Sequence, residues 1–93
     1  MKDTGLRTRV IHNIAIISGF DEEVINETKR LMEDLLMSEV ARGELAPGFQ
    51  RIARETNPKA SISKASCKGL KTVKSAITLV QAKALLSSDS KNV

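Results

Sequence analysis

Residues 48–66, GFQRIARETNPKASISKAS, decide the fold that we predict for this 93-residue chain. The pairs Pro47-Gly48 and Asn57-Pro58 interrupt the helical pattern, because proline lacks a backbone donor and glycine and asparagine favour turns. Short runs with partial alternation of apolar and polar residues lie on either side of Asn57-Pro58. Such runs are typical of paired strands. We therefore predict a β-hairpin with strands at residues 48–55 and 59–66, within a β region that spans residues 45–66.

Charge is distributed unequally around this hairpin. Residues 1–50 carry a net charge of −3 and residues 51–93 a net charge of +7, which together give +4 for the chain. Arg51, Arg54, Lys59 and Lys64 lie on the predicted strands. A basic half of this kind favours a polyanionic partner, either nucleic acid or an anionic membrane.

The residues before the hairpin predict two helices that form a helical hairpin over residues 8–43. The first helix covers residues 8–18 and ends before Gly19, and the second begins at the N-cap Asp21 and ends at Gly43. The spacing of apolar residues in the second helix predicts a buried stripe. Its members are Val24, Thr28, Leu31, Met32, Leu35, Leu36 and Val40.

The residues after the hairpin predict a C-terminal helix over residues 69–87, followed by a flexible polar tail at residues 88–93. Steps of three and four residues join the members of one apolar seam, as in a helix packed on others. The seam consists of Leu70, Val73, Ile77, Val80 and Ala84. Lys68, Lys71 and Lys74 lie at the start of this helix. The whole chain, residues 1–93, is expected to form a single domain.

Several function classes lack the residues that they need. One cysteine and one histidine cannot form a disulfide or a His- or Cys-based metal site, so we expect no metal and no cofactor. We find no Ser, His and acid grouping and no Gly-rich phosphate loop after a strand, so we expect no enzyme. No apolar run is long enough to span a bilayer, so we expect a cytoplasmic protein without a membrane partner.

Four stretches, in this order, resemble the bacterial HU and IHF nucleoid-associated proteins. They are TRVIHNIAIISGFDEEVINETKRLMEDLLMSEVARGE, GFQRI, RETNP and CKGLKTVKSAI, which together cover roughly residues 8–77. The resemblance implies an α+β fold with two N-terminal helices, a β-hairpin arm, a C-terminal helix and an intertwined dimer. The chain departs from the family pattern in a shorter arm, in Thr56 where the family usually has arginine, and in Cys67 where it usually has phenylalanine.

This resemblance implies an architectural protein that binds double-stranded DNA in the nucleoid with little sequence preference. Its basic arms would contact phosphates and bend the duplex modestly, with Pro58 as a candidate wedge between base steps. The partner chain would be a second copy or a related chain. The predicted DNA-binding residues are Arg51, Arg54, Asn57, Pro58, Lys59, Lys64, Lys68, Lys71 and Lys74.

Two alternatives to DNA binding remain open. The acidic N-terminal half also suits a regulator that pairs with an HU-like subunit or with another nucleoid or phage protein. The C-terminal segment could instead lie on an anionic membrane as a basic amphipathic helix, although its seam has no Trp or Phe.

Overall fold

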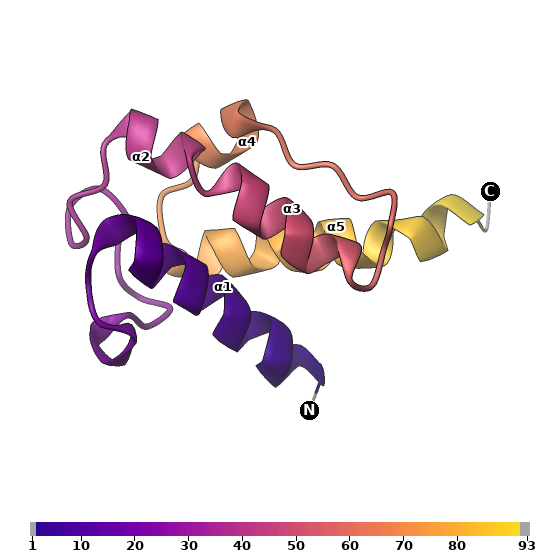
Figure 1. The fold of residues 1–93 in the computed structure, drawn as a ribbon, viewed down its shortest axis with the longest axis horizontal. Coiled ribbons are helices and arrows are strands. Elements are labelled where there is room, and N and C mark those ends of the chain that lie inside the picture. Colours follow the sequence, from indigo (N-terminus) through magenta and orange to yellow (C-terminus); the bar gives the residue numbers. More distant parts are fainter. Residues whose placement is uncertain (1, 92–93) are drawn as a thin grey trace.

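The computed structural model describes the backbone of residues 2–91 and the side chains of residues 5–85. Its elements are α1 (Lys2–Ser18), the 3-10 turn η1 (Glu22–Val24), α2 (Glu39–Gly43), α3 (Ala46–Arg54), α4 (Lys64–Lys68) and α5 (Val73–Lys91) (Figure 1). Residues 2–91 contain no β-strand, and their one isolated bridge joins Arg30 to Thr72. The predicted α+β fold with a hairpin arm is therefore wrong, and the protein is helical.

The first predicted strand is helix α3, for two local reasons. Pro47 lies in the first turn of α3, where a helix does not need the missing backbone donor. Gly48 lies where α3 approaches α1, since a Cβ on Gly48 would be 2.3 Å from Oδ1 of Asn13. The Pro47-Gly48 pair thus begins a helix and allows close packing, and it is not the predicted break before a strand.

The second predicted strand is an irregular segment followed by α4. Residues 59–63 are bonded by side chains of α3: Nε of Arg54 donates to the carbonyl oxygen of Ala60 at 2.7 Å, and Oε1 of Gln50 accepts from the backbone N–H of Ile62 at 3.0 Å. The Ser63 side chain then accepts the backbone N–H of Ser66 and caps α4. The partner of this segment is a helix, so no arm projects from the body.

The predicted second helix over residues 21–43 is also wrong. Its residues form η1, a series of turns and the short helix α2. Oδ1 of Asn26 accepts hydrogen bonds from the backbone N–H and the hydroxyl of Thr28. These bonds form a local turn that competes with helix formation. Leu31 and Lys29 then bond to the start of α5, through Leu31 N–H to Lys71 O and Val73 N–H to Lys29 O. These non-local bonds replace helical ones.

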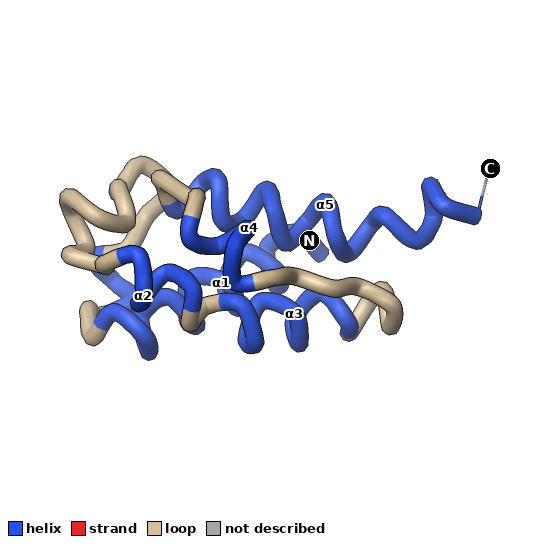
Figure 2. Tube along the Cα trace, turned by 90° about the horizontal axis from the view of Figure 1, so that it is seen from above, coloured by secondary structure: helices blue, strands red, loops and turns tan. Residues whose placement is uncertain are grey.

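The core lies among α1, α3 and α5, which pack against one another in all three pairings. Phe49, Ile14, Val10 and Val80 are among its fully buried side chains. The tube view shows α5 extending past the rest of the body toward the C-terminus (Figure 2). The expected helix at residues 8–18 is confirmed, although α1 begins earlier, at Lys2.

The C-terminal helix and its seam are confirmed in part. Every predicted seam residue is buried, including Val73 and Val80 at zero exposure. The helix begins at Val73, later than the predicted residue 69, and continues through Lys91 across most of the predicted tail; residues 92 and 93 lie outside the described residues. No helix within residues 2–91 combines the length and the apolar character that a membrane span requires.

Candidate polyanion-binding surface

The structure distributes the predicted DNA-binding residues over four segments. Arg51 and Arg54 lie on α3, Lys64 and Lys68 on α4, Lys71 just before α5 and Lys74 in its first turn, and Asn57, Pro58 and Lys59 in the turn after α3. All of these side chains except Asn57 are exposed. The cations are therefore accessible to a ligand, but from a helical body.

Asn57 has a structural environment instead of an exposed tip. Its side chain is 4% exposed. Its Nδ2 donates to the carbonyl oxygen of Lys83 at 2.8 Å, and its Oδ1 accepts from the backbone N–H of Lys59 at 3.1 Å. These bonds fasten the turn to α5, so the Asn57 side chain is not available to contact DNA. Pro58 is exposed beside it in a turn without strands.

Lys64 and Lys68 lie one helical turn apart on α4, so they share a face of that helix. The stem of Lys68 crosses Gly43 of α2, because a Cβ on Gly43 would lie 3.2 Å from Lys68 Cε and 3.4 Å from Lys68 Cγ. On the other side of α4, Cys67 is fully buried, and this burial raises the pKa of its thiol to about 11. α4 is thus fixed by its inner face while its lysines remain outside.

The start of α5 provides cations, but its backbone N–H groups are not free to bind an anion. Thr72 Oγ1 accepts the backbone N–H of Ser75 at 3.0 Å, while the N–H groups of Val73 and Lys74 bond to the carbonyl oxygens of Lys29 and Glu27. The amide donors that could bind phosphate at a helix start are therefore occupied. Any anion here would be bound by the ammonium groups of Lys71 and Lys74.

Ion pairs within residues 5–85 leave this group of cations free. Three pairs join Arg7 to Glu27, Arg9 to Glu55, and Arg30 to Asp34, and the His12 ring forms a hydrogen bond with Glu22. Glu55 is the one acidic residue of the segment 51–85, and it pairs with Arg9 of α1. We define the basic surface as the exposed cations whose side chains form neither one of these pairs nor a hydrogen bond within residues 5–85: Arg51, Lys59, Lys64, Lys68, Lys71 and Lys74. Arg54 is excluded because its Nε donates to the carbonyl oxygen of Ala60.

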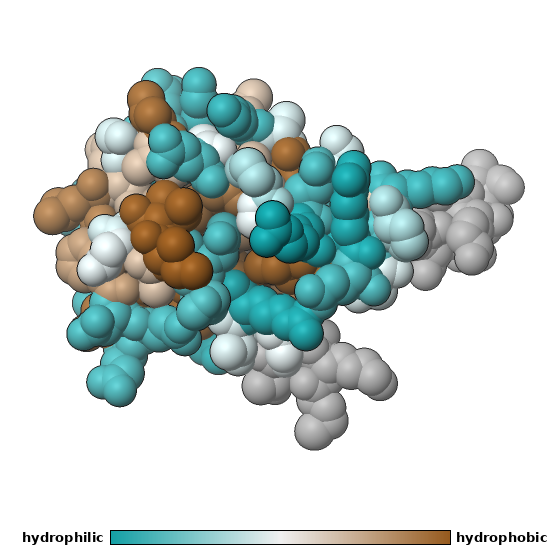
Figure 3. All heavy atoms as spheres, in the orientation of Figure 1, coloured by the Kyte–Doolittle hydropathy of each residue, from teal (hydrophilic) through white to brown (hydrophobic). Residues whose placement is uncertain are grey.

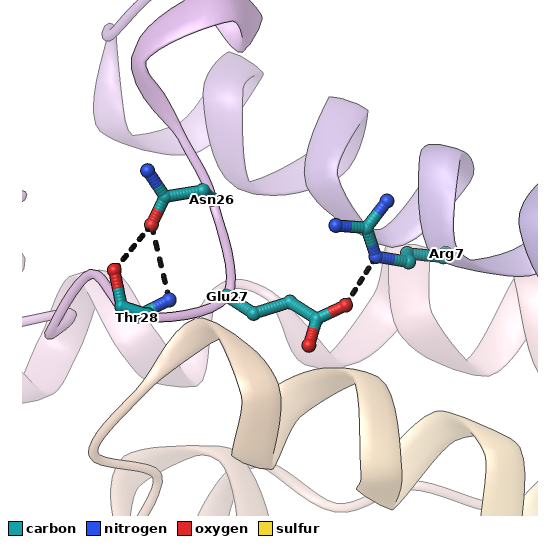
Figure 4. Close-up of polar contacts among 4 residues, drawn as sticks. All are labelled: Arg7, Asn26, Glu27 and Thr28. Atoms are coloured by element: carbon teal, nitrogen blue, oxygen red, sulfur yellow. Dashed lines mark hydrogen bonds and ion pairs between the residues drawn. The ribbon is translucent and has the colours of Figure 1, made fainter.

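The acidic half of the chain, by contrast, uses several of its charges internally. Figure 4 shows Glu27 reaching across to Arg7 of α1, beside the Asn26–Thr28 turn. Asp34 accepts the backbone N–H of Arg30 at 2.7 Å, and this bond lowers the pKa of its carboxyl group. The positive charge of the molecule is therefore concentrated on residues that no internal carboxylate neutralises.

Among the described residues, no group of three or more His, Cys, Asp and Glu side chains could hold a metal ion. A groove of about 490 Å³ lies among α1, α3 and α5, with Leu6, Ile52 and Leu85 in its wall and the Arg9–Glu55 pair beside them. None of the basic surface residues lines this groove. The two features are therefore separate.

Besides the basic surface and the groove, the structure has a set of exposed apolar residues that the sequence analysis did not predict. Val24, Met32, Leu36 and Val40 were all predicted to be buried, yet they are 47–77% exposed. The run Leu35-Leu36-Met37 was a usable signal, because three consecutive apolar residues cannot all point to one face of a helix.

No protein-family model, no curated protein and no solved structure matches this chain.

Proposed function

We propose that this chain is a non-enzymatic module that binds double-stranded nucleic acid through its basic surface. The observation that carries the proposal is the set of six exposed cations whose side chains form neither an ion pair nor a hydrogen bond within residues 5–85. Four of them, Lys64, Lys68, Lys71 and Lys74, fall within eleven consecutive residues. This spacing suits contacts with neighbouring phosphates of one duplex.

Binding of this kind draws its free energy from neutralised phosphates and released counterions. The amide donors at the start of α5 are occupied, and flexible lysines act as point charges, so the contacts carry little sequence information. The bending expected from the resemblance depended on a projecting arm. Since residues 45–66 form no arm, bending is not part of the proposal.

A duplex fits the structure better than an anionic membrane. Membrane binding by the C-terminal helix would need its apolar seam at the lipid surface. Val73, Val80 and Ala84 of that seam are instead packed in the core at 0–3% exposure. The lysines near the start of α5 are left as an electrostatic surface without an adjoining apolar face.

The test is fluorescence anisotropy with a labelled 20-base-pair duplex at several salt concentrations. If Lys64 contacts a phosphate, Lys64→Gln reduces the slope of log K against log salt by about 0.9. Lys29→Gln is the matched control, because Lys29 lies in the acidic half and its slope should equal that of the wild type. Equal slopes for both variants and the wild type would remove Lys64 from the site, and no salt-dependent binding of any duplex would refute the function.

A further inference from the structure

Three exposed apolar side chains lie close together in the sequence on the acidic half of the molecule. Met32, Leu36 and Val40 are 51%, 77% and 67% exposed. Between them, Leu35 and Met37 are buried and attach the segment to the core. Figure 3 shows exposed apolar residues at the left of the molecule, over the C-terminal end of α1 as well as near α2 and the turns beside it. Exposed apolar residues that lie together are typical of interaction sites.

The backbone at Leu36 supports a role for this exposure. Leu36 has a φ of 57°, in the left-handed region that glycine adopts freely and leucine only at a cost. The backbone N–H of Met37 bonds to the carbonyl oxygen of Leu31 at 2.9 Å and closes the turn around Leu36. The chain thus holds a large apolar side chain outward where a glycine would be less strained, which points to a use for that side chain.

Three carboxylates lie in the same stretch of sequence as these apolar residues. Glu33, Asp34 and Glu39 are exposed in the same nine-residue segment. Glu33 and Glu39 take part in none of the ion pairs among residues 5–85. A partner that covers Leu36 therefore has to bring apolar groups flanked by positive charge.

We propose that Met32, Leu36 and Val40, with the exposed carboxylates of the same segment, form a docking surface for a basic amphipathic helix of another protein. Apolar residues of that helix would contact the three side chains, and its lysines or arginines would face Glu33 and Glu39. A symmetric contact between two copies of this chain is disfavoured, because it would place these carboxylates against one another. This surface is distinct from the basic surface, so the two proposals stand or fall separately.

The test uses two labelled synthetic 16-residue amphipathic peptides that share one leucine ridge, one with lysines and the other with glutamates beside it. Anisotropy with the full chain should show binding of the lysine peptide and at least tenfold weaker binding of the glutamate peptide. Amide shifts in an NMR titration should concentrate in residues 31–41. Equal binding of both peptides, or shifts concentrated at the groove beside Leu85, would overturn the proposal.

Leu36→Gly is the decisive variant, because it removes the side chain and relieves the backbone. It should melt no lower than the wild type and bind the lysine peptide at least tenfold more weakly. Val40→Ser provides a second reduction in affinity without a change at a left-handed residue. Leu85→Ala is the matched control, since Leu85 is 62% exposed on α5 and should bind as the wild type does. Unchanged binding by Leu36→Gly, or self-association that Leu36→Gly abolishes, would contradict a heterologous partner.

Discussion

At the residue scale, Asn57 shows how a predicted DNA contact becomes a structural bond. Its buried amide joins the turn after α3 to the carbonyl oxygen of Lys83 on α5. Asn57→Ala removes both bonds and leaves the Lys59 N–H without its acceptor, so unfolding should require about 1–3 kcal/mol less free energy in urea titrations. Pro58→Ala, next to it and exposed, serves as the control and should lose little. Equal losses for both variants would contradict this assignment.

Asp34 gives a second prediction at this scale, with a defined pH dependence. The backbone N–H of Arg30 holds the pKa of the Asp34 carboxyl below its ordinary value, so the ionised form favours the folded state. This contribution is present above the unfolded-state pKa of about 3.9 and disappears as the pH falls through the lower folded value. Asp34→Asn should therefore lower the melting temperature at pH 7 and have a smaller effect at pH 2. A loss of the same size at both pH values would exclude the carboxylate as its cause.

At the element scale, the irregular segment 59–63 depends on α3. Oε1 of Gln50 is the acceptor for the N–H of Ile62, whose side chain is 5% exposed. Gln50→Ala should destabilise the fold by about 1–3 kcal/mol, because it leaves a buried donor unsatisfied. Gln50→Glu retains an acceptor and should recover most of the loss in thermal unfolding. If segment 59–63 were instead a strand paired through its backbone, both variants would behave alike.

The same elements show how far the sequence predicts the fold. Val73, Ile77 and Val80 specify the packed face of α5 by their spacing alone, and α1 contains the helix expected at residues 8–18. The predictions for Pro47 and for segment 21–43 were wrong, because the secondary structure of these residues depends on contacts with other elements. The approach of Asn13 to Gly48 and the bond from Leu31 to Lys71 are examples that no local pattern contains.

In the candidate sites, too, some features could be predicted from the local sequence and others depend on contacts elsewhere in the fold. Exposure of the six cations of the basic surface could be predicted from their charge, since unpaired lysine and arginine are rarely buried. The run Leu35-Leu36-Met37 indicates that one of its side chains points away from the core, but that this residue is Leu36 could not be predicted, because it depends on a left-handed backbone between two buried neighbours. The exposure of a charged side chain can be predicted because burying an unpaired charge is costly. The exposure of an apolar side chain depends on the rest of the fold.

At the scale of the whole molecule, the core closes within one chain. Phe49, Ile14 and Leu31 are fully buried without a second copy, so the intertwined dimer that the resemblance implied is no longer needed to complete the core. The thermal midpoint should therefore not change between about 5 and 500 μM protein, because only a folded oligomer gains stability from concentration. A midpoint that rises with concentration in calorimetry would show that assembly contributes to folding. Association after folding stays a separate prediction, which sedimentation of the same samples checks.

The proposed binding of duplex phosphates by the basic surface can be measured with a variant in which Lys64, Lys68, Lys71 and Lys74 are all changed to glutamine. The quantity to compare with the wild type is the salt dependence of duplex binding. With the fold confirmed by circular dichroism, log K should depend less steeply on log salt than in the wild type. The magnitude of the negative slope should decrease by about 3.6, since each lost contact removes about 0.9. A slope and an affinity equal to those of the wild type would contradict the claim.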